Sequence, residues 1–211
     1  MSKRVILLGA GGFGREVIAW TSDAYKAGAM PEITSFADDN PTALARFSYD
    51  LEYLGSIMDL KVNPDDLLLV GVASPLVKKK IFENFSEYID QFLTLIHPSA
   101  VVASTATIGR GVVICPFALI SADTQISDFV TINVMSSIGH DSIIGKFSTL
   151  SGHVDVTGQV QVGEAVFFGS GAKIIPRIKI GENSKIGAGC TVMRSVPPNV
   201  TYYTTPAKKL S

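Results

Sequence analysis

Two adjacent residues, His140 and Asp141, are the best candidates in the sequence for proton-transfer chemistry. Imidazole titrates near neutral pH, so a histidine can remove a proton from an amine or a hydroxyl while that group attacks a carbonyl. The carboxylate that follows could orient the ring or raise its basicity. The residues alone leave a second interpretation open, in which His140 is an exposed turn histidine bonded to its neighbour.

A glycine-rich segment near the start of the chain could bind a nucleotide. It has the form G-x-G-x-x-G over residues 9–14 and follows the apolar run Val5–Leu8. Helical spacing of apolar residues comes next, so the loop lies between an expected strand and an expected helix, which is the context of a dinucleotide site. Asp38 and Asp39 close a second expected strand and could bind a ribose or a uracil ring.

These features raise an NAD-dependent enzyme as one alternative. The part of the chain that contains them has only about 95 residues, which is one mononucleotide-binding half and not two. A nucleotide-binding protein that uses the glycine loop alone is therefore a further alternative.

Composition excludes several other classes of function. The chain has 211 residues, a net charge of −1 and no basic stripe, so we expect no nucleic-acid partner. Cys115 and Cys190 are too sparse for a disulfide framework or a metal site, and Cys190 has a packing position. The run Lys78–Lys80 is most simply the solvated face of a helix. We expect no membrane span and no signal peptide, and hence a cytoplasmic protein.

A period of six residues predicts the elements that position His140. An apolar residue recurs at every sixth position from Val102 to Val192, sixteen times in all. Such a hexapeptide period is typical of a β-helix with triangular coils, and three hexads make one coil of 18 residues. The series therefore predicts about five coils. His140 comes two residues after the inward-facing Ile138, so it should lie on a turn and not in the core.

The first part of the chain has a different pattern of apolar residues. Residues 4–96 lack the hexad period and alternate expected strands, at 5–8, 33–37 and 67–72, with helices, the second of them at 75–88. This order predicts an α/β half-Rossmann-like domain with a small parallel sheet. We place the boundary at His97-Pro98, which gives domains 1–96 and 97–211 in close contact.

Four segments together resemble a known group of enzymes. They are Gly9-Ala10-Gly11-Gly12, Ile96-His97-Pro98-Ser99-Ala100, the stretch Gly139-His140-Asp141-Ser142-Ile143-Ile144-Gly145, and Pro206-Ala207-Lys208. The chain resembles the left-handed β-helix acyltransferases with hexapeptide repeats. Within them it is similar to the sialic acid O-acetyltransferase (NeuD) family and the bacterial N-acetyltransferases of nucleotide-linked 4-amino sugars. The resemblance implies a left-handed parallel β-helix and a homotrimer.

The resemblance also implies roles for particular residues. His140 would be the general base and Asp141 its partner, and the acetyl group would come from acetyl-CoA without a metal. The cofactor would lie in a groove between adjacent β-helices. The residues implied as its contacts are Thr149, near the thioester, and Gly158, Ser170 and Ala188. The residues implied as nucleotide-sugar contacts are Gly11, Gly12, Phe13, Asp38 and Asp39. The candidates for the CoA phosphates are Lys173, Lys185, Arg194, Lys208 and Lys209.

The sequence departs from the 4-amino-sugar enzymes near the glycine loop. Those enzymes often have histidine where this chain has Phe13, and Gly-Asn where it has Gly71-Val72-Ala73. We predict transfer of acetyl to a sugar amine or hydroxyl, on a nucleotide-linked amino sugar used for a surface glycan, by direct attack. The alternatives are O-acetylation of sialic acid or another non-nucleotide acceptor, and a non-catalytic nucleotide-binding β-helix protein.

Overall fold

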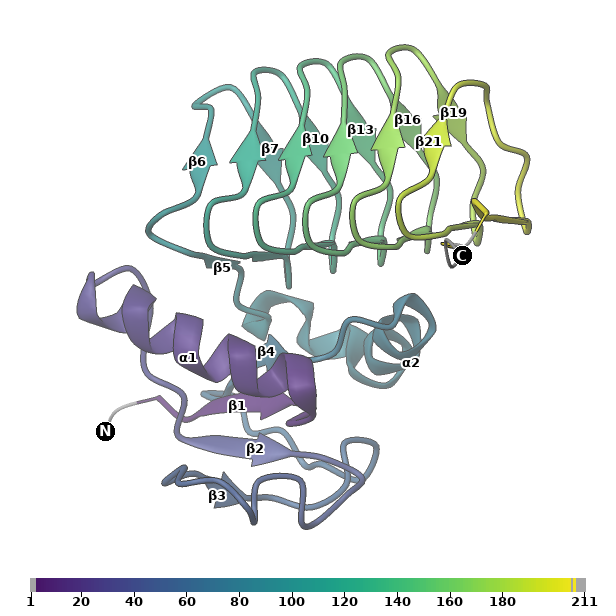
Figure 1. The fold of residues 1–211 in the computed structure, drawn as a ribbon. Helices are drawn as coiled ribbons and strands as arrows, with labels where there is room; N and C mark the ends of the chain where they lie inside the picture. The colour runs from purple at the N-terminus through teal and green to yellow at the C-terminus, as the bar shows by residue number, and fades with distance from the viewer. Residues whose placement is uncertain (1–2, 206, 208–211) are drawn as a thin grey trace.

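The computed structural model describes residues 3–205 and 207, which form two differently built parts (Figure 1). The N-terminal part is a parallel sheet in the order β3-β2-β1-β4, with strands β1 (Val5–Leu8), β2 (Ser35–Ala37), β3 (Glu52–Tyr53) and β4 (Leu67–Val70). Its helices are α1 (Gly12–Lys26), α2 (Pro75–Phe85) and a 3-10 helix at Ser86–Gln91. The predicted helix at 75–88 thus changes to the tighter form after Phe85.

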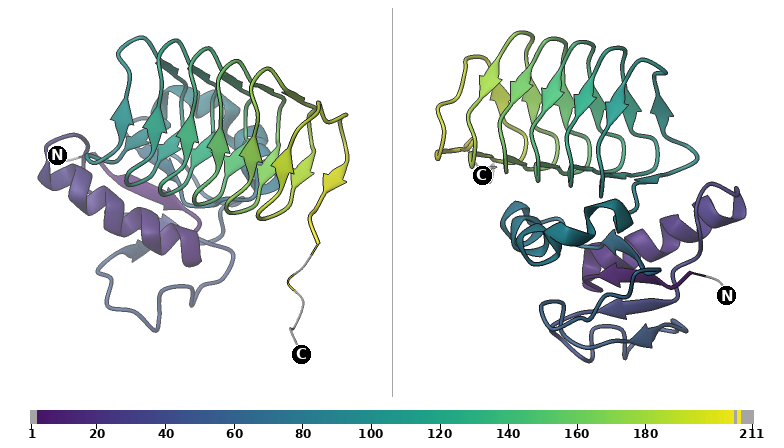
Figure 2. Two further views of the ribbon diagram at one scale, coloured as in Figure 1. Left: turned by 45° about the horizontal axis from the view of Figure 1, so that its top comes forward. Right: turned by 180° about the vertical axis from the view of Figure 1, so that it is seen from behind.

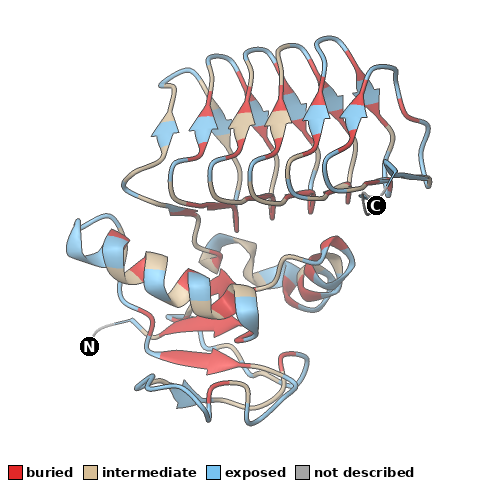
Figure 3. Cartoon of the chain, viewed as in Figure 1, coloured by how far each residue is buried: buried red, intermediate tan, exposed pale blue. Residues whose placement is uncertain are grey.

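The central strand β1 is covered on both faces, as a buried parallel strand requires. All four of its residues are buried (Figure 3). Leu7 packs in the cluster that contains Val17 of α1, whereas Leu8 packs in the cluster that contains Ile81 of α2. The two helices therefore cover opposite faces of the sheet, which confirms the half-Rossmann-like architecture.

Glycine allows the loops at the carboxyl ends of β1 and β4 to approach each other closely. A Cβ atom on Gly14 or on Gly71 would overlap the carbonyl oxygen of Gly9. The third glycine of the fingerprint thus serves the packing of helix on strand, as it does in other folds of this kind.

The rest of the chain is a β-helix of short parallel strands with three flat faces (Figure 2). The seven-stranded face contains β5 (Leu95–Ile96), β8 (Val113–Ile114), β11 (Thr131–Ile132), β14 (Thr149–Leu150), β17 (Phe167–Phe168), β20 (Lys185–Ile186) and β22 (Thr201–Tyr202). The six-stranded face contains β6 (Val101–Val102), β9 (Leu119–Ile120), β12 (Ser137–Ile138), β15 (Asp155–Val156), β18 (Lys173–Ile174) and β21 (Thr191–Val192). The five-stranded face contains β7 (Thr107–Ile108), β10 (Gln125–Ile126), β13 (Ile143–Ile144), β16 (Gln161–Val162) and β19 (Lys179–Ile180).

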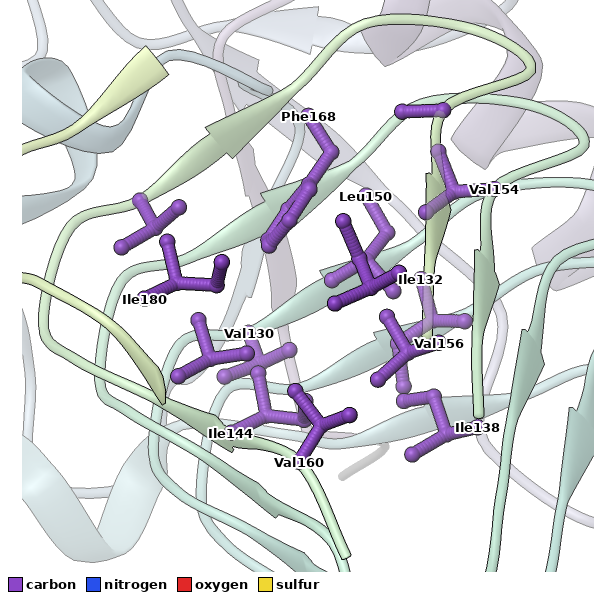
Figure 4. Packing of buried hydrophobic residues seen from close by; sticks show 14 of the residues in the cluster. Val130, Ile132, Ile138, Ile144, Leu150, Val154, Val156, Val160, Phe168 and Ile180 are labelled. Atoms are coloured by element: carbon purple, nitrogen blue, oxygen red, sulfur yellow. The ribbon is translucent and has the colours of Figure 1, made fainter. Parts of the chain in front are cut away.

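The hexad residues form the core of this β-helix. Each pairs with the residue 18 positions away, as Ile126 does with Ile144 and Ile144 with Val162. Their side chains fill the interior in stacked layers (Figure 4). Burying one such side chain stabilises the fold by about 1.5–3 kcal/mol, so the ladder supplies most of the driving force for this domain. The predicted period and architecture are confirmed. The seven-stranded face starts at Leu95, two residues before the expected boundary.

Three columns of two-residue turns form the edges between the faces. The His140 edge includes the turns at 122–123, 140–141 and 158–159, and it joins the six-stranded to the five-stranded face. The Phe147 edge includes the turns at 128–129, 146–147, 164–165 and 182–183. The Ser170 edge includes those at 116–117, 134–135, 152–153, 170–171 and 188–189, and it joins the seven-stranded to the six-stranded face.

The N-terminal domain packs on the seven-stranded face and the Phe147 edge. Phe82 of α2 lies 5.5 Å, between ring centroids, from both Phe129 and Phe147 of that edge. On the face itself, Val113 and Cys115 belong to the same apolar cluster as α1. Apolar clusters therefore continue from one domain into the other. The domains are packed against each other and are not joined by a linker alone. No helix in the described part of the chain is long and apolar enough to cross a membrane.

Candidate functional site

His140 and Asp141 form the turn between β12 and β13 and lie on the His140 edge. The Nδ1 atom of His140 lies 2.7 Å from Oδ2 of Asp141, and the two side chains are 64% and 52% exposed. Because a carboxylate can only accept, Nδ1 carries the hydrogen and donates it. In neutral imidazole the second nitrogen, Nε2, is then free to accept a proton, and no described residue bonds to it. This is the tautomer that a general base needs.

Gly158 lies one coil above His140, against the imidazole ring. A Cβ atom at this glycine would be 2.6 Å from Nε2 and 2.8 Å from Cε1 of His140. Only glycine therefore leaves room for the ring in its present position. The backbone N–H of Gly158 donates no hydrogen bond to any described residue. The position was predicted from the 18-residue coil, but this free amide was not.

The other proposed cofactor contacts lie on a different edge. Ser170 and Ala188 occupy the first turn position of successive coils on the Ser170 edge. The six-stranded face separates this edge from the His140 edge. One chain alone therefore stacks Ser170 with Ala188, and His140 with Gly158, but does not bring the two pairs together.

Thr149, a predicted contact of the cofactor, is enclosed in the single chain. Thr149 lies on the seven-stranded face beneath the N-terminal domain and is 1% exposed. Its hydroxyl donates to the carbonyl of Ala73 at 2.7 Å and accepts from Nζ of Lys78 at 2.7 Å. A residue enclosed in this way offers no surface to a thioester.

The basic residues predicted to bind the CoA phosphates lie on different faces and edges of the β-helix. Lys173 follows the Ser170 edge on the six-stranded face, whereas Lys185 lies on the seven-stranded face. Arg194 continues the column of the His140 edge. The remaining two candidates for the CoA phosphates, Lys208 and Lys209, lie outside the described residues. Of the three candidates that the structure describes, only Lys173 follows directly after the predicted cofactor edge.

The glycine loop is open to solvent at the carboxyl end of the sheet. Gly11 and Gly12 are exposed, and a Cβ on either would meet no atom within 4 Å. Phe13 is half-buried and packs edge-on against Trp20, with ring centroids 6.0 Å apart. The ring of Phe13 offers no hydrogen bond to a ligand, in contrast to a histidine at this place.

The two acidic residues after β2 are already bonded to the protein. Oδ2 of Asp38 accepts from the backbone N–H of Ala10 at 2.7 Å, and Oδ1 accepts from that of Asn40 at 2.8 Å. Oδ1 of Asp39 accepts from the Ser56 hydroxyl at 2.7 Å. Asp38 therefore fixes the glycine loop to the end of β2. Asp39 has one carboxylate oxygen, Oδ2, without a described partner.

A pocket of about 630 Å³ lies between the start of α2 and the upper coils. Its walls combine apolar and polar side chains: Ser74, Pro75, Leu76, Ala165, Phe167, Asn183, Lys185, Asn199, Val200 and Thr201. Residues from such distant parts of the sequence give no local signal, so the sequence did not predict this pocket. It lies where the loop after β4 meets the seven-stranded face.

The other histidines have less to offer chemically. Nδ1 of His97 lies 2.7 Å from the Ser99 hydroxyl, and its Nε2 lies 3.4 Å from Asp23 of α1, so this residue contacts both domains. His153 is exposed on the Ser170 edge, beside the turn that carries Gly152. No group of three or more metal-ligating side chains occurs in residues 3–205 and 207.

Two family models match separate segments of the chain. A model described as the PglD N-terminal domain matches residues 4–85, and a model of the bacterial transferase hexapeptide (six repeats) matches residues 159–194. Among curated proteins, UDP-N-acetylbacillosamine N-acetyltransferase of Bacillus subtilis (strain 168) is 37% identical over 120 residues. That match covers 53% of this chain and 51% of the relative, so it spans about half the length of the curated protein.

Solved structures match over nearly the whole chain. A mutant of perosamine N-acetyltransferase from Caulobacter crescentus, in complex with CoA and GDP-perosamine, superposes with a TM-score of 0.84 at 27% identity. This match covers 99% of this chain and 97% of that one. The acetyltransferase domain of PglB from Neisseria gonorrhoeae FA1090, in complex with acetyl coenzyme A, has a TM-score of 0.86 at 26% identity and covers 100% of both chains. The chain is thus similar to a PglD-type N-terminal domain and to hexapeptide-repeat transferases in separate segments, and its fold is like that of these acetyltransferases.

Proposed function

We propose that the chain transfers the acetyl group of acetyl-CoA to the amine of a nucleotide-linked amino sugar. The observation that carries the proposal is the His140–Asp141 pair, with Nε2 free beneath Gly158. The substrates follow from the solved neighbours, whose complexes contain CoA with GDP-perosamine, or acetyl coenzyme A. We place the reaction in the cytoplasm.

The chemistry is a direct transfer between bound substrates. Nε2 of His140 accepts a proton from the sugar amine while the amine nitrogen attacks the thioester carbonyl carbon. Asp141 holds Nδ1–H at 2.7 Å, which orients the ring and stabilises the imidazolium that forms. The carbon–sulfur bond then breaks, and the leaving sulfur takes the proton from His140, so that CoA leaves as the thiol and the histidine is neutral again. The free N–H of Gly158 is the proposed donor to the developing oxyanion, since it lies beside the ring.

We further propose that the protein is a homotrimer, because a second copy completes the site. The exposed large apolar side chains of the six-stranded face are Val101, Leu119, Ile175 and Met193, and Phe117 and Met135 lie on the adjoining Ser170 edge. Among the described residues of the five-stranded face, only Ile143 is an exposed side chain that is both large and apolar. Three copies with their six-stranded faces inward would bring the His140 edge of one copy alongside the Ser170 edge of the next. His140 and Gly158 would then meet Ser170 and Ala188 of the neighbour.

The acceptor fits the pocket beside α2. Gly11, Gly12 and Asp39 lie at the carboxyl end of the sheet, where open α/β sheets bind nucleotides. The loop after β4 leads from that end into Ser74–Leu76, which line the pocket. A nucleotide on the glycine loop would therefore direct its sugar along the seven-stranded face toward the Ser170 edge, where the proposed trimer would bring His140 of the neighbouring copy. Lys185 and Asn183 supply polar groups there for sugar hydroxyls or a phosphate.

The test is an assay of thiol release from acetyl-CoA with a panel of nucleotide-linked amino sugars and matched hydroxyl acceptors. We expect turnover with an amino sugar, and a loss of about 10²–10⁴ in rate for His140→Ala. Turnover with hydroxyl acceptors alone would replace N-transfer by O-transfer. If no acceptor turns over and acetyl-CoA does not raise the melting temperature, the proposal is wrong.

A further inference from the structure

Lys78, in α2, is a buried lysine whose amine contacts no carboxylate. The residue is 0% exposed, although the sequence suggested a solvated face for Lys78–Lys80. Its Nζ atom lies 2.7 Å from Oγ1 of Thr149, 3.0 Å from the carbonyl oxygen of Ser148 and 3.0 Å from Oγ1 of Thr131. All three partners belong to the seven-stranded face or the turn before it, so this one amine joins the two domains.

The hydrogen bonds around Nζ can be satisfied by an uncharged amine when the Thr131 hydroxyl acts as the donor. The Ser148 carbonyl can only accept, and the Thr149 hydroxyl gives its own hydrogen to the Ala73 carbonyl and so must also accept. The Thr131 hydroxyl is the remaining partner and can donate. An amine has two hydrogens and one lone pair, which satisfies two acceptors and one donor. An ammonium would leave the Thr131 hydrogen without a described acceptor.

The electrostatic surroundings agree with this hydrogen-bond count. Burial lowers the pKa of the Lys78 amine well below its usual range, and no charged partner opposes that shift. The charged groups on α2 and on the neighbouring Phe147 edge are Lys79, Lys80, Glu83, Asp128, Lys146, Glu164 and Glu182. The only described ion pairs among them and their neighbours are Lys79 with Glu164 and Lys146 with Asp128, and neither includes Nζ of Lys78.

The network ends at the wall of the pocket beside α2. The backbone N–H of Lys78 donates to the carbonyl of Ser74 at 3.0 Å, and Ser74 lines that pocket. On the opposite wall, Phe167 pairs with Thr149 in the sheet. The backbone of Lys78 thus bonds to one wall, while its side-chain amine bonds to the strand next to the other wall.

We propose that Lys78 is an uncharged positioning residue that holds the start of α2 against the β-helix and thereby sets the shape of the acceptor pocket. The assignment of this pocket to the acceptor rests on the proposed function. The uncharged state of Lys78 does not rest on it, so the two can fail separately.

The activity test compares Lys78→Met with wild type. Methionine keeps the length and apolar stem of the side chain but cannot form the three bonds. We expect KM for the acceptor to rise roughly tenfold or more, because small displacements of a binding wall are costly, while KM for acetyl-CoA stays within about twofold. Lys80→Met makes the same chemical change at an exposed position of the same helix and should alter neither constant. An unchanged acceptor KM in Lys78→Met would overturn the positioning role.

A second measurement tests the uncharged state without any substrate. In the unfolded chain the lysine is protonated below a pKa of about 10.4, so unfolding takes up a proton that the folded chain lacks. Wild type should therefore gain stability relative to Lys78→Met as pH rises toward that value. Parallel curves for the two proteins would show a charged Lys78 and overturn the proposal. Should Lys78→Met not fold, Thr131→Val removes one bond from the same amine. We expect the same rise in acceptor KM there, and its absence would count against the proposal.

Discussion

Gly158 offers the sharpest test of the proposed general base, because a single methyl group at this position acts directly on the ring of His140. In Gly158→Ala the new Cβ would lie 2.6 Å from Nε2, whereas ordinary contacts begin at 3.4 Å, so the ring must move by about 0.8 Å. A rotation that avoids the methyl group would instead lengthen the 2.7 Å bond to Asp141. A misplacement of about 1 Å costs on the order of 10² in rate, which corresponds to about 2.7 kcal/mol of transition-state stabilisation.

The backbone itself should tolerate this substitution. Gly158 is not among the glycines with positive φ, so alanine fits its backbone, and the melting temperature should stay within a few degrees of wild type. The assay is kcat/KM for thiol release, measured for wild type, Gly158→Ala, His140→Ala and the double variant. If the methyl group acts only through the ring, it costs less than about twofold once the histidine is gone. Full activity of Gly158→Ala, or an equal loss in both backgrounds, would refute the assignment of Nε2 as the base.

Three further predictions follow from contacts described above. Asp141→Asn keeps the shape of the turn but weakens the hold on Nδ1, so kcat should fall, though by less than in His140→Ala; unchanged kcat in the assay would exclude a role for the carboxylate. Leu119→Arg places a charge on the apolar six-stranded face and should shift the protein to monomer in gel filtration, with loss of turnover; a trimer that persists would disprove that interface. Burial opposes ionisation of Asp66, but its hydrogen bonds from Arg4 and from the backbone of Asn63 outweigh burial and lower its pKa. The stability that this carboxylate adds is therefore present above pH about 3.9 and is lost as pH falls through the lowered pKa. Asp66→Asn should cost about 1–2 kcal/mol at pH 7, and denaturant titrations should show the difference from wild type vanishing in acid.

The regular part of the fold was predictable because one rule repeats without interruption. The hexad period requires an inward side chain at Ile138 and a turn at His140, and the 18-residue coil places Gly158 above that turn. None of these inferences needs knowledge of distant contacts. The same rule could not reveal what covers each face from outside. Thr149 has the same register as the exposed Lys185, yet the N-terminal domain buries it.

The missed features all depend on contacts between distant segments. Lys78 is buried by residues 53 to 71 positions away, so its neighbours Lys79 and Lys80 gave no warning. Asp38 looked like a free ligand, but the Ala10 amide, 28 positions earlier, occupies one of its oxygens. The pocket beside α2 joins Ser74 to Thr201. In each case the chemistry of the residue was clear from its type, and only the fold decided which partner it would have.

The left-handed turns give an independent indication of which surfaces make contacts. At the second turn position φ is near +60° in twelve residues other than glycine, a conformation that costs roughly 1–2 kcal/mol for most side chains and least for asparagine or glycine. Large apolar residues occupy four of these positions: Phe117, Phe129, Met135 and Phe147. Phe129 and Phe147 are buried against α2. The contacts of their side chains with the N-terminal domain therefore offset the backbone strain. Phe117 and Met135 carry the same strain but are 64% and 54% exposed in a single chain. Phe117 and Met135 thus resemble Phe129 and Phe147 in strain and side-chain type, and a neighbouring copy on the Ser170 edge would bury them in the same way.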